Sequence, residues 1–257
     1  MIFLLYNLSD FFLLIDILIL IKENNMKYEI IGGSFPAVNV TLERGETVFT
    51  QSGAMAWSDT NVSMETNAQG GFLKSLGRAL SGASLMFVRH TATADSADIT
   101  FSASFPGEIR EFYVDANHEF IAQKSAFLVA EEGVEVDATM SKSFWAGLAG
   151  GEGFILQRFH GEGSVLVEID GSVVELDLEP GQQIKVDTGH VALFEASVQY
   201  DVESVKGFKN IFFGGQGLFL TTLTGPGKVY LQTLTAQDMA QKLIPFIPTN
   251  NVSTNDK

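Results

Sequence analysis

The amino-acid sequence predicts an all-β protein made of three internal repeats, and three observations lead to that prediction. Apolar and polar residues alternate over most of the chain after Tyr28, one segment aligns with two later segments without a gap, and glycines recur at equivalent positions. Alternation with a period of two is typical of half-buried strands. Self-similarity along the chain indicates that one supersecondary unit is repeated.

The repeat is clearest for residues 38–64, which align with residues 174–200 at an offset of 136 positions (181 − 45). An offset of 72 positions (117 − 45) gives another copy, in which Asn117 replaces Gly45. Glycine and asparagine accept a left-handed backbone more readily than other residues. We therefore expect one turn geometry in all three copies, and Pro180 followed by Gly181 favours a type II turn.

Each copy begins with an alternating strand and continues into a denser apolar one. In the first copy Val38, Val40 and Leu42 are predicted to face the core, and residues 174–178 repeat that pattern. The denser strands lie at residues 55–57, 127–129 and 191–194. Runs of this kind indicate strands that are covered on both faces.

The second halves of the copies also match. Residues 151–165 align with residues 215–229 at an offset of 64 positions (215 − 151), and the corresponding strand of the first copy is predicted at residues 85–88. We expect short helices in insertions at residues 72–80 and 143–149. The residues predicted to form structural turns are Gly45, Asn117, Gly181, Gly161, Gly163, Gly225 and Gly227.

These copies predict one domain rather than three. We place the repeats at about 28–103, 104–170 and 171–235, because a unit of about 65 residues buries too little surface to be stable alone. The three copies are therefore expected to share one apolar interior in a pseudo-threefold arrangement. The domain is predicted to span residues 26–243 and to close with a helix at residues 236–243. Residues 244–257 form a polar tail that we expect to fray.

The first 25 residues are apolar but are interrupted by Asn7, Asp10 and Asp16. An aspartate near the middle of a membrane span costs about 3 kcal/mol, and a secretory signal needs a positive start and a small-residue cleavage site. Codons for Lys22 and Glu23 can resemble a bacterial ribosome-binding sequence. We expect translation to begin at Met26, which makes residues 1–25 a non-native upstream extension; an apolar leader that anchors the protein is the alternative.

Composition excludes several functions. The chain has no cysteine, which excludes disulfides, thiolate–zinc sites and cysteine nucleophiles and fits a cytoplasmic protein. Acidic residues outnumber basic ones by 31 to 16, giving a net charge of −15. Nucleic-acid binding depends on neutralising phosphates with Lys and Arg, so we expect no nucleic-acid partner.

No catalytic or metal-binding motif is present in the sequence. The four histidines form neither an H-x-H nor an H-E-x-x-H pattern. His160 is interpreted as a surface turn residue and His190 as a structural histidine, with an acid–base or ligand role as the weaker alternative for His190. Gly151 and Gly153 lack the third glycine of a nucleotide loop and recur at Gly215, which favours a structural turn. We predict no catalytic residue, no metal and no cofactor.

A basic amphipathic segment is the candidate contact site for a membrane or a partner protein. The segment spans residues 72–80, and its apolar residues lie at helical spacing beside Lys74 and Arg78. The alternative is that its apolar side caps one end of the core. A second apolar segment, the insertion at residues 143–149, contributes Phe144 and Trp145 as further candidate contact residues. The candidate contact residues are Phe72, Leu73, Lys74, Leu76, Arg78, Leu80, Phe144 and Trp145.

Several motifs together resemble the AIM family (altered inheritance of mitochondria, member twenty-four) and its uncharacterised bacterial relatives. They are residues 217–233, 151–159 and 186–190, and Gly70–Gly71 with Arg78. The resemblance covers residues 26–243 and implies a TRAP-like fold, similar to that of the tryptophan RNA-binding attenuation protein, in which antiparallel β-sandwich units are repeated within one chain. It also implies an unassigned biochemical function, although the yeast member is linked to mitochondrial inner-membrane organisation. A likeness of fold transfers no site.

These observations predict a non-catalytic structural or interaction protein that forms a homo-oligomer in the bacterial cytoplasm. Peripheral contact with the inner membrane is left open. A small-ligand-binding protein that uses a cleft between repeats is the main alternative. An enzyme with a nonstandard site is the third.

Overall fold

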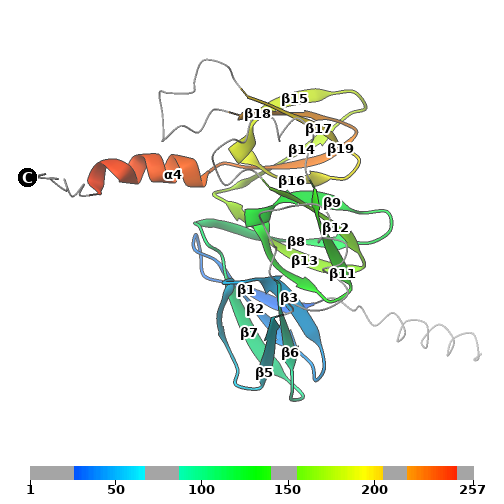
Figure 1. Cartoon of the computed structure of the whole chain (residues 1–257), viewed down its shortest axis with the longest axis vertical. Helices are drawn as coiled ribbons and strands as arrows, with labels where there is room; N and C mark the ends of the chain where they lie inside the picture. The colour runs from blue at the N-terminus through cyan, green and yellow to red at the C-terminus, as the bar shows by residue number, and fades with distance from the viewer. Residues whose placement is uncertain (1–25, 67–86, 140–154, 205–218, 248–257) are drawn as a thin grey trace, which may run out of the picture.

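The computed structural model describes residues 26–66, 87–139, 155–204 and 219–247. Within these ranges the chain is almost entirely antiparallel β-sheet, with one short α-helix near the C-terminus, so the all-β prediction is confirmed. The sheets follow one another along the longest axis of the molecule (Figure 1). No helix in these ranges is both long and apolar enough to cross a membrane.

Four sheets contain all the described strands, and hydrogen bonds between neighbouring strands define the order within each sheet. The first sheet is β1 (Lys27–Ile31), β2 (Ala37–Leu42), β7 (Ala97–Ser102) and β4 (Met55–Ser58). The second is β5 (Val62–Thr66), β6 (Phe87–Ala92), β3 (Thr47–Gln51), β10 (Phe127–Glu131), β13 (Gly163–Asp170) and β8 (Gly107–Val114). The third is β11 (Val134–Thr139), β12 (Leu156–Gly161), β9 (Phe120–Gln123), β16 (Val191–Glu195), β19 (Gly227–Gln232) and β14 (Val173–Leu178). The fourth is β15 (Gln183–Asp187), β18 (Phe219–Thr224) and β17 (Gln199–Ser204).

One pairing order recurs along the chain. Strand β7 lies between β2 and β4, just as β13 lies between β8 and β10 and β19 lies between β14 and β16. The hairpin strands follow a second rule: β6 lies between β5 and β3, β12 between β11 and β9, and β18 between β17 and β15. The two middle sheets are long because strands of successive copies pair there, β3 with β10 and β9 with β16.

A local irregularity recurs at the same place. The register shifts between Met55 and Trp57 in β4, between Phe127 and Val129 in β10, and between Val191 and Leu193 in β16. Each shift leaves one extra residue against the neighbouring strand, which is the pattern of a β-bulge. A bulge bends its strand, so these three strands deviate from regular pairing at equivalent points.

The apolar residues form three clusters rather than one. The first cluster contains Val40 and Ile99 of the first sheet together with Leu166 of the second. The second cluster contains Val165 of the second sheet and Phe159 of the third, and a further cluster holds Phe194 with Leu223 of the fourth. Our expectation of one shared interior is wrong, because each core is closed between two successive sheets and the sheets are stacked in series.

The alternating strands largely face as predicted. Val38, Val40 and Leu42 are buried and Leu178 is buried in the third copy. Val174 is exposed, contrary to the prediction, because β14 is the edge strand of its sheet. The strand predicted at residues 85–88 of the first copy is described from Phe87 and runs to Ala92, and residues 85–86 lie outside the described residues.

Two of the three denser apolar strands are buried as predicted, and the third is not. Strands β10 and β16 are buried over four residues each, as predicted. Strand β4 is not covered on both faces, and its Trp57 side chain is 57% exposed. The prediction is wrong there because β4 has β7 on one side and forms the edge of its sheet within the described residues.

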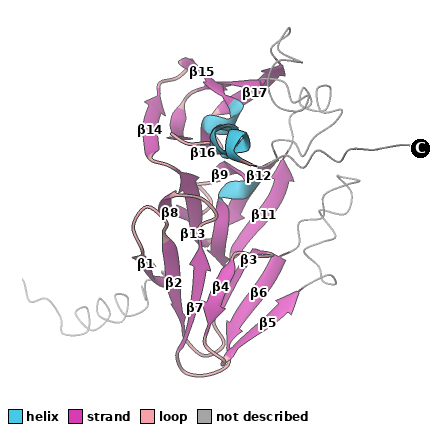
Figure 2. Ribbon diagram, turned by 90° about the vertical axis from the view of Figure 1, so that its left-hand side faces the viewer, coloured by secondary structure: helices cyan, strands magenta, loops and turns pink. Residues whose placement is uncertain are grey.

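Helix α4 (Ala236–Leu243) forms where a closing helix was predicted. The Thr235 hydroxyl accepts a hydrogen bond from the Asp238 backbone N–H at 3.0 Å, which caps the first turn. However, α4 extends away from the sheets instead of closing them, and none of its residues is buried (Figures 1 and 2). The segment that follows, predicted to be polar, starts with exposed Ile244 and Phe246.

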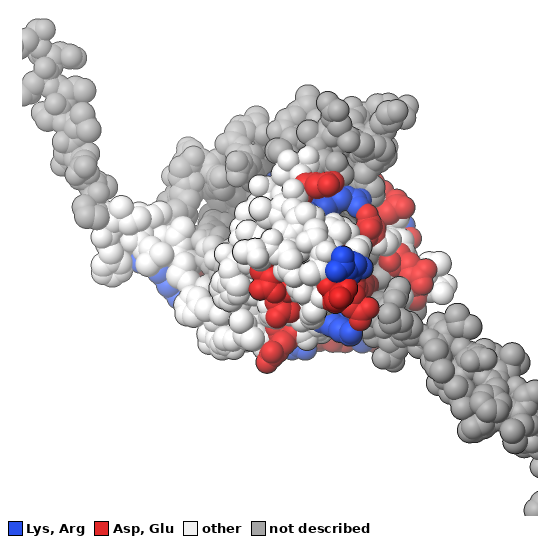
Figure 3. All heavy atoms as spheres, turned by 90° about the horizontal axis from the view of Figure 1, so that it is seen from below, with Lys and Arg blue, Asp and Glu red and all other residues white. Residues whose placement is uncertain are grey.

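The surface carries both signs of charge. Lys27 pairs with Glu43 and Arg44 pairs with Asp95, each at 2.8 Å. Acidic and basic side chains lie next to one another on the end of the molecule that carries the first sheet (Figure 3). This face therefore shows mixed charge rather than a continuous basic patch of the kind that phosphate backbones require.

Candidate functional site

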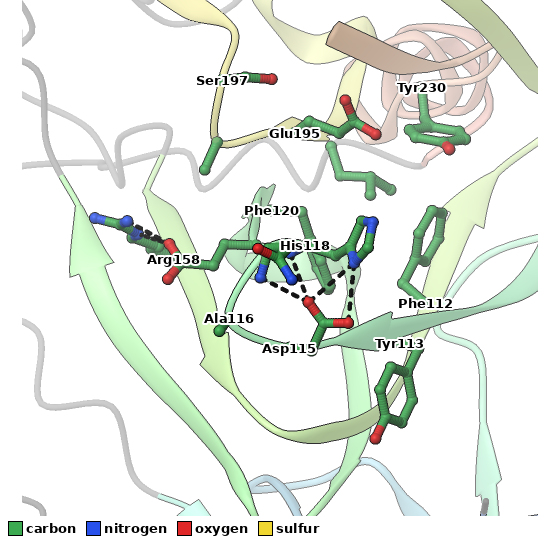
Figure 4. Close-up of a pocket in the computed structure, with 14 residues that line it drawn as sticks. Phe112, Tyr113, Asp115, Ala116, His118, Phe120, Arg158, Glu195, Ser197 and Tyr230 are labelled. Atoms are coloured by element: carbon green, nitrogen blue, oxygen red, sulfur yellow. Dashed lines mark hydrogen bonds and ion pairs between the residues drawn. The ribbon is translucent and has the colours of Figure 1, made fainter.

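A cleft of about 910 Å³ lies where the loop after β8 approaches the turn after β16 (Figure 4). The loop comes from the second copy and the turn from the third. The backbone N–H of Ala196 in the turn donates to the Glu119 carbonyl at 2.9 Å, which holds the two walls together. The cleft therefore lies at the junction between two copies, where the sequence pattern predicted Asn117 as a turn residue and no contact residue.

Aromatic side chains form the floor of the cleft. The ring of Phe112 meets Tyr230 edge to face, with centroids 4.9 Å apart, and lies 5.4 Å from the ring of Phe120. Phe120 in turn stacks on Phe159 at 4.8 Å. Burial, and then the nearby Glu175 carboxylate, raise the pKa of Tyr230 above its ordinary value.

An Asp–His pair forms one wall. The His118 Nδ1 atom lies 2.9 Å from Oδ1 and 3.0 Å from Oδ2 of Asp115. The backbone N–H groups of Asn117 and His118 also donate to Asp115 Oδ1, at 2.7 and 2.9 Å. The hydrogen bond from His118, followed by that from Asn117, lowers the pKa of Asp115. The imidazole ring lies between Asp115 and the side of the cleft that holds Glu195 and Tyr230 (Figure 4).

The other charged groups of the cleft have partners. Arg158 Nε donates to Glu119 Oε2 at 2.8 Å, and the Glu195 carboxylate accepts from the Lys228 backbone N–H at 3.0 Å. Aromatic faces beside paired carboxylates, an imidazole and a guanidinium can bind a small polar ligand by stacking and hydrogen bonding. The His118 side chain is 68% exposed, whereas an acid–base histidine usually operates in a desolvated site. No described group of three or more His, Asp or Glu side chains could hold a metal ion.

A second cleft, of about 410 Å³, lies at the equivalent junction between the first and second copies. It contains Glu46 and Glu131, which correspond to His118 (118 − 46 = 72) and Glu195 (195 − 131 = 64) of the larger cleft. Burial is the main cause that raises the pKa of Glu131. Two junctions within the chain therefore form clefts from the same pair of positions, with different side chains.

The structure describes only some of the predicted site residues. The candidate contact residues Phe72, Leu73, Lys74, Leu76, Arg78 and Leu80 lie outside the described residues, and so do Phe144 and Trp145. The predicted insertion helices lie outside them too. The turn residues Gly45, Gly181, Gly161, Gly163 and Gly227 all have positive φ, and Gly225 lies in the turn between β18 and β19.

Asn117 differs from the glycines that it replaces. The N–H groups of Gly45 and Gly181 donate to the carbonyls of Ala92 and Gly225, at 2.8 and 3.1 Å. The N–H of Asn117 donates to the Asp115 side chain instead. The second copy thus departs from the common turn, and this departure places His118 in the cleft.

The remaining histidines have local structural contacts or lie in the core. His190 Nδ1 lies 2.7 Å from the Gln232 carbonyl, and His160 Nε2 lies 3.0 Å from Asp137 Oδ2. His160 belongs to strand β12 rather than to a turn, which corrects its predicted location. His90 is buried against Phe101, with ring centroids 5.5 Å apart.

Sequence reasoning missed the residues of the cleft. Asp115, Arg158, Glu195 and Tyr230 come from four different strands or loops, so their proximity depends on how the copies are joined. One signal was available: an acidic residue follows the denser strand in every copy, at Asp59, Glu131 and Glu195. The pattern Asp115-x-Asn-His118 directly after a strand was another.

Comparison with known proteins identifies a family but not an activity. A family model described as mitochondrial biogenesis AIM24 matches residues 28–234. An uncharacterised protein from Streptococcus pyogenes serotype M6 (strain ATCC BAA-946 / MGAS10394) is 25% identical over 236 residues, which cover 89% of this chain and 94% of that protein. An X-ray crystal structure of a Streptococcus pyogenes protein is similar with a TM-score of 0.70 at 23% identity, covering 87% of this chain and 100% of the other. That structural match is evidence for the fold alone.

Proposed function

The chain belongs to the mitochondrial biogenesis AIM24 family, and on that premise we propose that it is a non-catalytic structural or interaction protein that associates with further copies of itself. The proposed body is three TRAP-like β-sandwich units in one chain. Repeated strand orders, repeated bulges and repeated clefts at the junctions support this arrangement.

The observation that carries the proposal is the way in which units are joined. Strand β3 pairs with β10 and strand β9 pairs with β16, so successive units are linked by backbone hydrogen bonds across a continuous sheet. A unit of this type therefore binds its neighbour through a strand edge. Each end unit is joined to the middle unit through one strand edge, and its other joining edge, β4 or β15, has no neighbour within the described part of the chain, which favours association between chains.

Light scattering coupled to size-exclusion chromatography tests the proposal directly on the full-length protein. The proposal predicts a mass that is a multiple of the 27.9 kDa chain and that rises with protein concentration or is already saturated. A mass of one chain at all concentrations up to the highest soluble one would contradict self-association.

The larger cleft supports a second candidate function, the binding of a small polar ligand. Its volume of about 910 Å³ falls in the range of small-molecule sites, and it combines an aromatic floor with charged walls. A metabolite that binds only the native state should raise the melting temperature of the wild-type protein. The variant Phe112→Ala, which removes part of the floor, should lose that increase, and Arg44→Ala, far from the cleft in the β2–β3 turn, should keep it. A metabolite panel that produces no shift would leave the cleft without support as a ligand site.

We propose a cytoplasmic location, with membrane contact through the basic segment at residues 72–80. Lys74 and Arg78 lie in an acidic protein, and a local cationic, apolar segment is suited to an anionic membrane surface. Liposome flotation should therefore weaken in the double variant Lys74→Glu/Arg78→Glu. The control variant Arg44→Glu changes the charge at an exposed ion pair instead and should float as the wild type does. Equal flotation of all three proteins would remove the membrane role.

A further inference from the structure

We infer that strand β15 of one chain pairs with strand β4 of a second chain. Chains then associate head to tail through the same strand pairing that links the units inside one chain. The inference rests on the proposed self-association and names the two surfaces that make it.

The two joints inside the chain share one register. In the first, Phe49 lies opposite Ala130 and Val48 lies opposite Glu131. In the second, Ile121 lies opposite Phe194 and Phe120 lies opposite Glu195. The offsets between copies map each pair of the first joint onto a pair of the second (121 − 49 = 72 and 194 − 130 = 64). The chain therefore forms the same strand-to-strand contact twice.

Each end of the chain presents one half of that contact. Strand β4 is the counterpart of β10 and β16, and β15 is the counterpart of β3 and β9. All four counterparts have a strand on both sides, whereas β4 and β15 are sheet edges within the described residues. The two edges belong to opposite ends of the molecule, so one chain does not join them to each other (Figures 1 and 2).

Burial shows what the missing neighbour would cover. Trp57 of β4 is 57% exposed, whereas its counterparts Val129 of β10 and Leu193 of β16 are both 0% exposed. On the other side, Ile184 and Val186 of β15 are half-buried, whereas Val48 and Ala122 at the corresponding positions of β3 and β9 are fully buried. An exposed tryptophan on an open sheet edge is a typical anchor of a protein–protein contact.

The other sheet edges do not lack a neighbour that is present at both of their counterpart strands. Strands β5, β11 and β17 are equivalent, and each of them is an edge. Strands β8 and β14 are edges too, and their counterpart β2 is covered by β1. Among the described strands, only β4 and β15 lack a neighbour that both of their counterparts possess, which singles out these two edges as the contact.

Both joints predict the same register between chains. When the residue pairs of either internal joint are moved onto β15 and β4 by the repeat offsets, Ser58 lies opposite Lys185 and Asp59 lies opposite Ile184. The joint between β9 and β16 adds a third pair, Trp57 opposite Val186. Lys185 occupies the position of Phe49 and Ile121, so this joint is more polar than the two inside the chain. Lys185 has a partner within its own chain, because its ammonium pairs with Glu203 of β17 at 2.6 Å.

Such an association is heterologous, because different surfaces meet. It produces a ring if the rotation between chains closes and an open fibre if it does not. It also completes a third cleft, in which Gln182 and Asp59 take the positions of His118 and Glu195 (182 − 118 = 64 and 195 − 59 = 136). The assembled protein would then have an equivalent cleft at every junction.

Cysteine cross-linking tests the register, since the chain has no cysteine of its own. We expect full-length Ser58→Cys and Lys185→Cys proteins, mixed and treated with a short bismaleimide, to give a two-chain product, and the double variant to give a ladder. The control mixture pairs Lys185→Cys with Ser63→Cys, on the exposed edge strand β5, and should stay uncross-linked. Equal yield from both mixtures would overturn the inference.

A second pair of variants tests the surface without a cross-linker. Trp57→Lys places a cation opposite the β15 edge. It should raise the dissociation constant between chains at least tenfold, as measured by light scattering. Met64→Lys makes a similar change at a residue that is 56% exposed on β5, and it should associate as the wild type does. If the wild type is monomeric, the proposed function fails and this inference with it. If the wild type associates and both variants behave alike, only this inference fails.

Discussion

The carboxylate of Glu195 accepts a hydrogen bond from the backbone N–H of Lys228 at 3.0 Å, and the same contact exists in the other two copies. Glu131 accepts from the Ser164 N–H at 2.6 Å, and Asp59 accepts from the Asp98 N–H at 3.0 Å. Each carboxylate lies at the end of a bulged strand, as the last residue of β10 and β16 or the residue after β4, and accepts from the strand beside it. The acidic residues that line the two clefts therefore also have a structural role.

Replacing Glu195 by alanine should lower the free energy of unfolding by about 1–2 kcal/mol, because the Lys228 N–H loses its charged acceptor. Urea denaturation measures the change. The matched variant is Glu175→Ala, which removes an exposed ion pair to the side chain of the same Lys228 and should cost less than about 0.5 kcal/mol. Equal losses in the two variants would mean that the backbone contact does not contribute.

The buried His90 should make the protein less stable in mild acid. Burial lowers the pKa of His90, so the folded state stays neutral while the unfolded state takes up a proton below its ordinary value of about 6.5. The unfolded state then binds more protons, and stability falls as pH decreases below that value. The variant His90→Leu should lose less stability than the wild type between pH 7.5 and pH 5.5, measured by urea unfolding. An identical pH slope in both proteins would contradict a neutral buried His90.

Glu168 should have the opposite pH dependence. Burial raises its pKa to about 7, although Ser104 donates from both its N–H and its hydroxyl. The folded state therefore keeps a proton that the unfolded state has released. The resulting stability is complete below the ordinary pKa of about 4.5 and is lost as pH rises through about 7.

The variant Glu168→Gln keeps the hydrogen-bonding shape without the charge. At pH 8 it should exceed the wild type in unfolding free energy by about 1–3 kcal/mol, since one pKa unit corresponds to about 1.4 kcal/mol. At pH 4 the two proteins should be nearly equal. Glu29→Gln, at an exposed position of β1, serves as the control and should change stability little at either pH. A variant that is less stable than the wild type at pH 8 would show that the ionised form is the stabilising one.

The turn at Gly181 depends on backbone conformation alone. Its φ is 80°, and an added Cβ would meet no atom within 4 Å. Gly181→Ala should therefore cost about 1 kcal/mol through left-handed strain, and Gly181→Asn should cost less. Gly33 also has open space around an added Cβ but no positive φ, so Gly33→Ala should be neutral or stabilising. Equal effects at the two glycines, in thermal unfolding, would rule out strain as the cause.

Alternation and internal similarity predicted much of the fold. They located the strand at residues 37–42 with Val38, Val40 and Leu42 inward, and they located the helix at residues 236–243. These features are local, because a period of two or 3.6 residues and a capping threonine act over a few positions. The prediction that residues 55–57 form a covered strand was wrong. The amino-acid composition of a segment shows that a strand is apolar, but it does not determine whether another strand pairs with it.

The sequence by itself determined the strand class, the turn glycines with positive φ and the membership of a family. Only the tertiary structure decided that the apolar faces close three cores in series, that α4 points away from the sheets, and that Asp115, His118 and Glu195 share a cleft. The physical reason is the range of the interactions. Backbone preference and side-chain alternation are encoded by neighbours in sequence, whereas the pairing of β3 with β10 and of β9 with β16 joins residues about 70 or more positions apart.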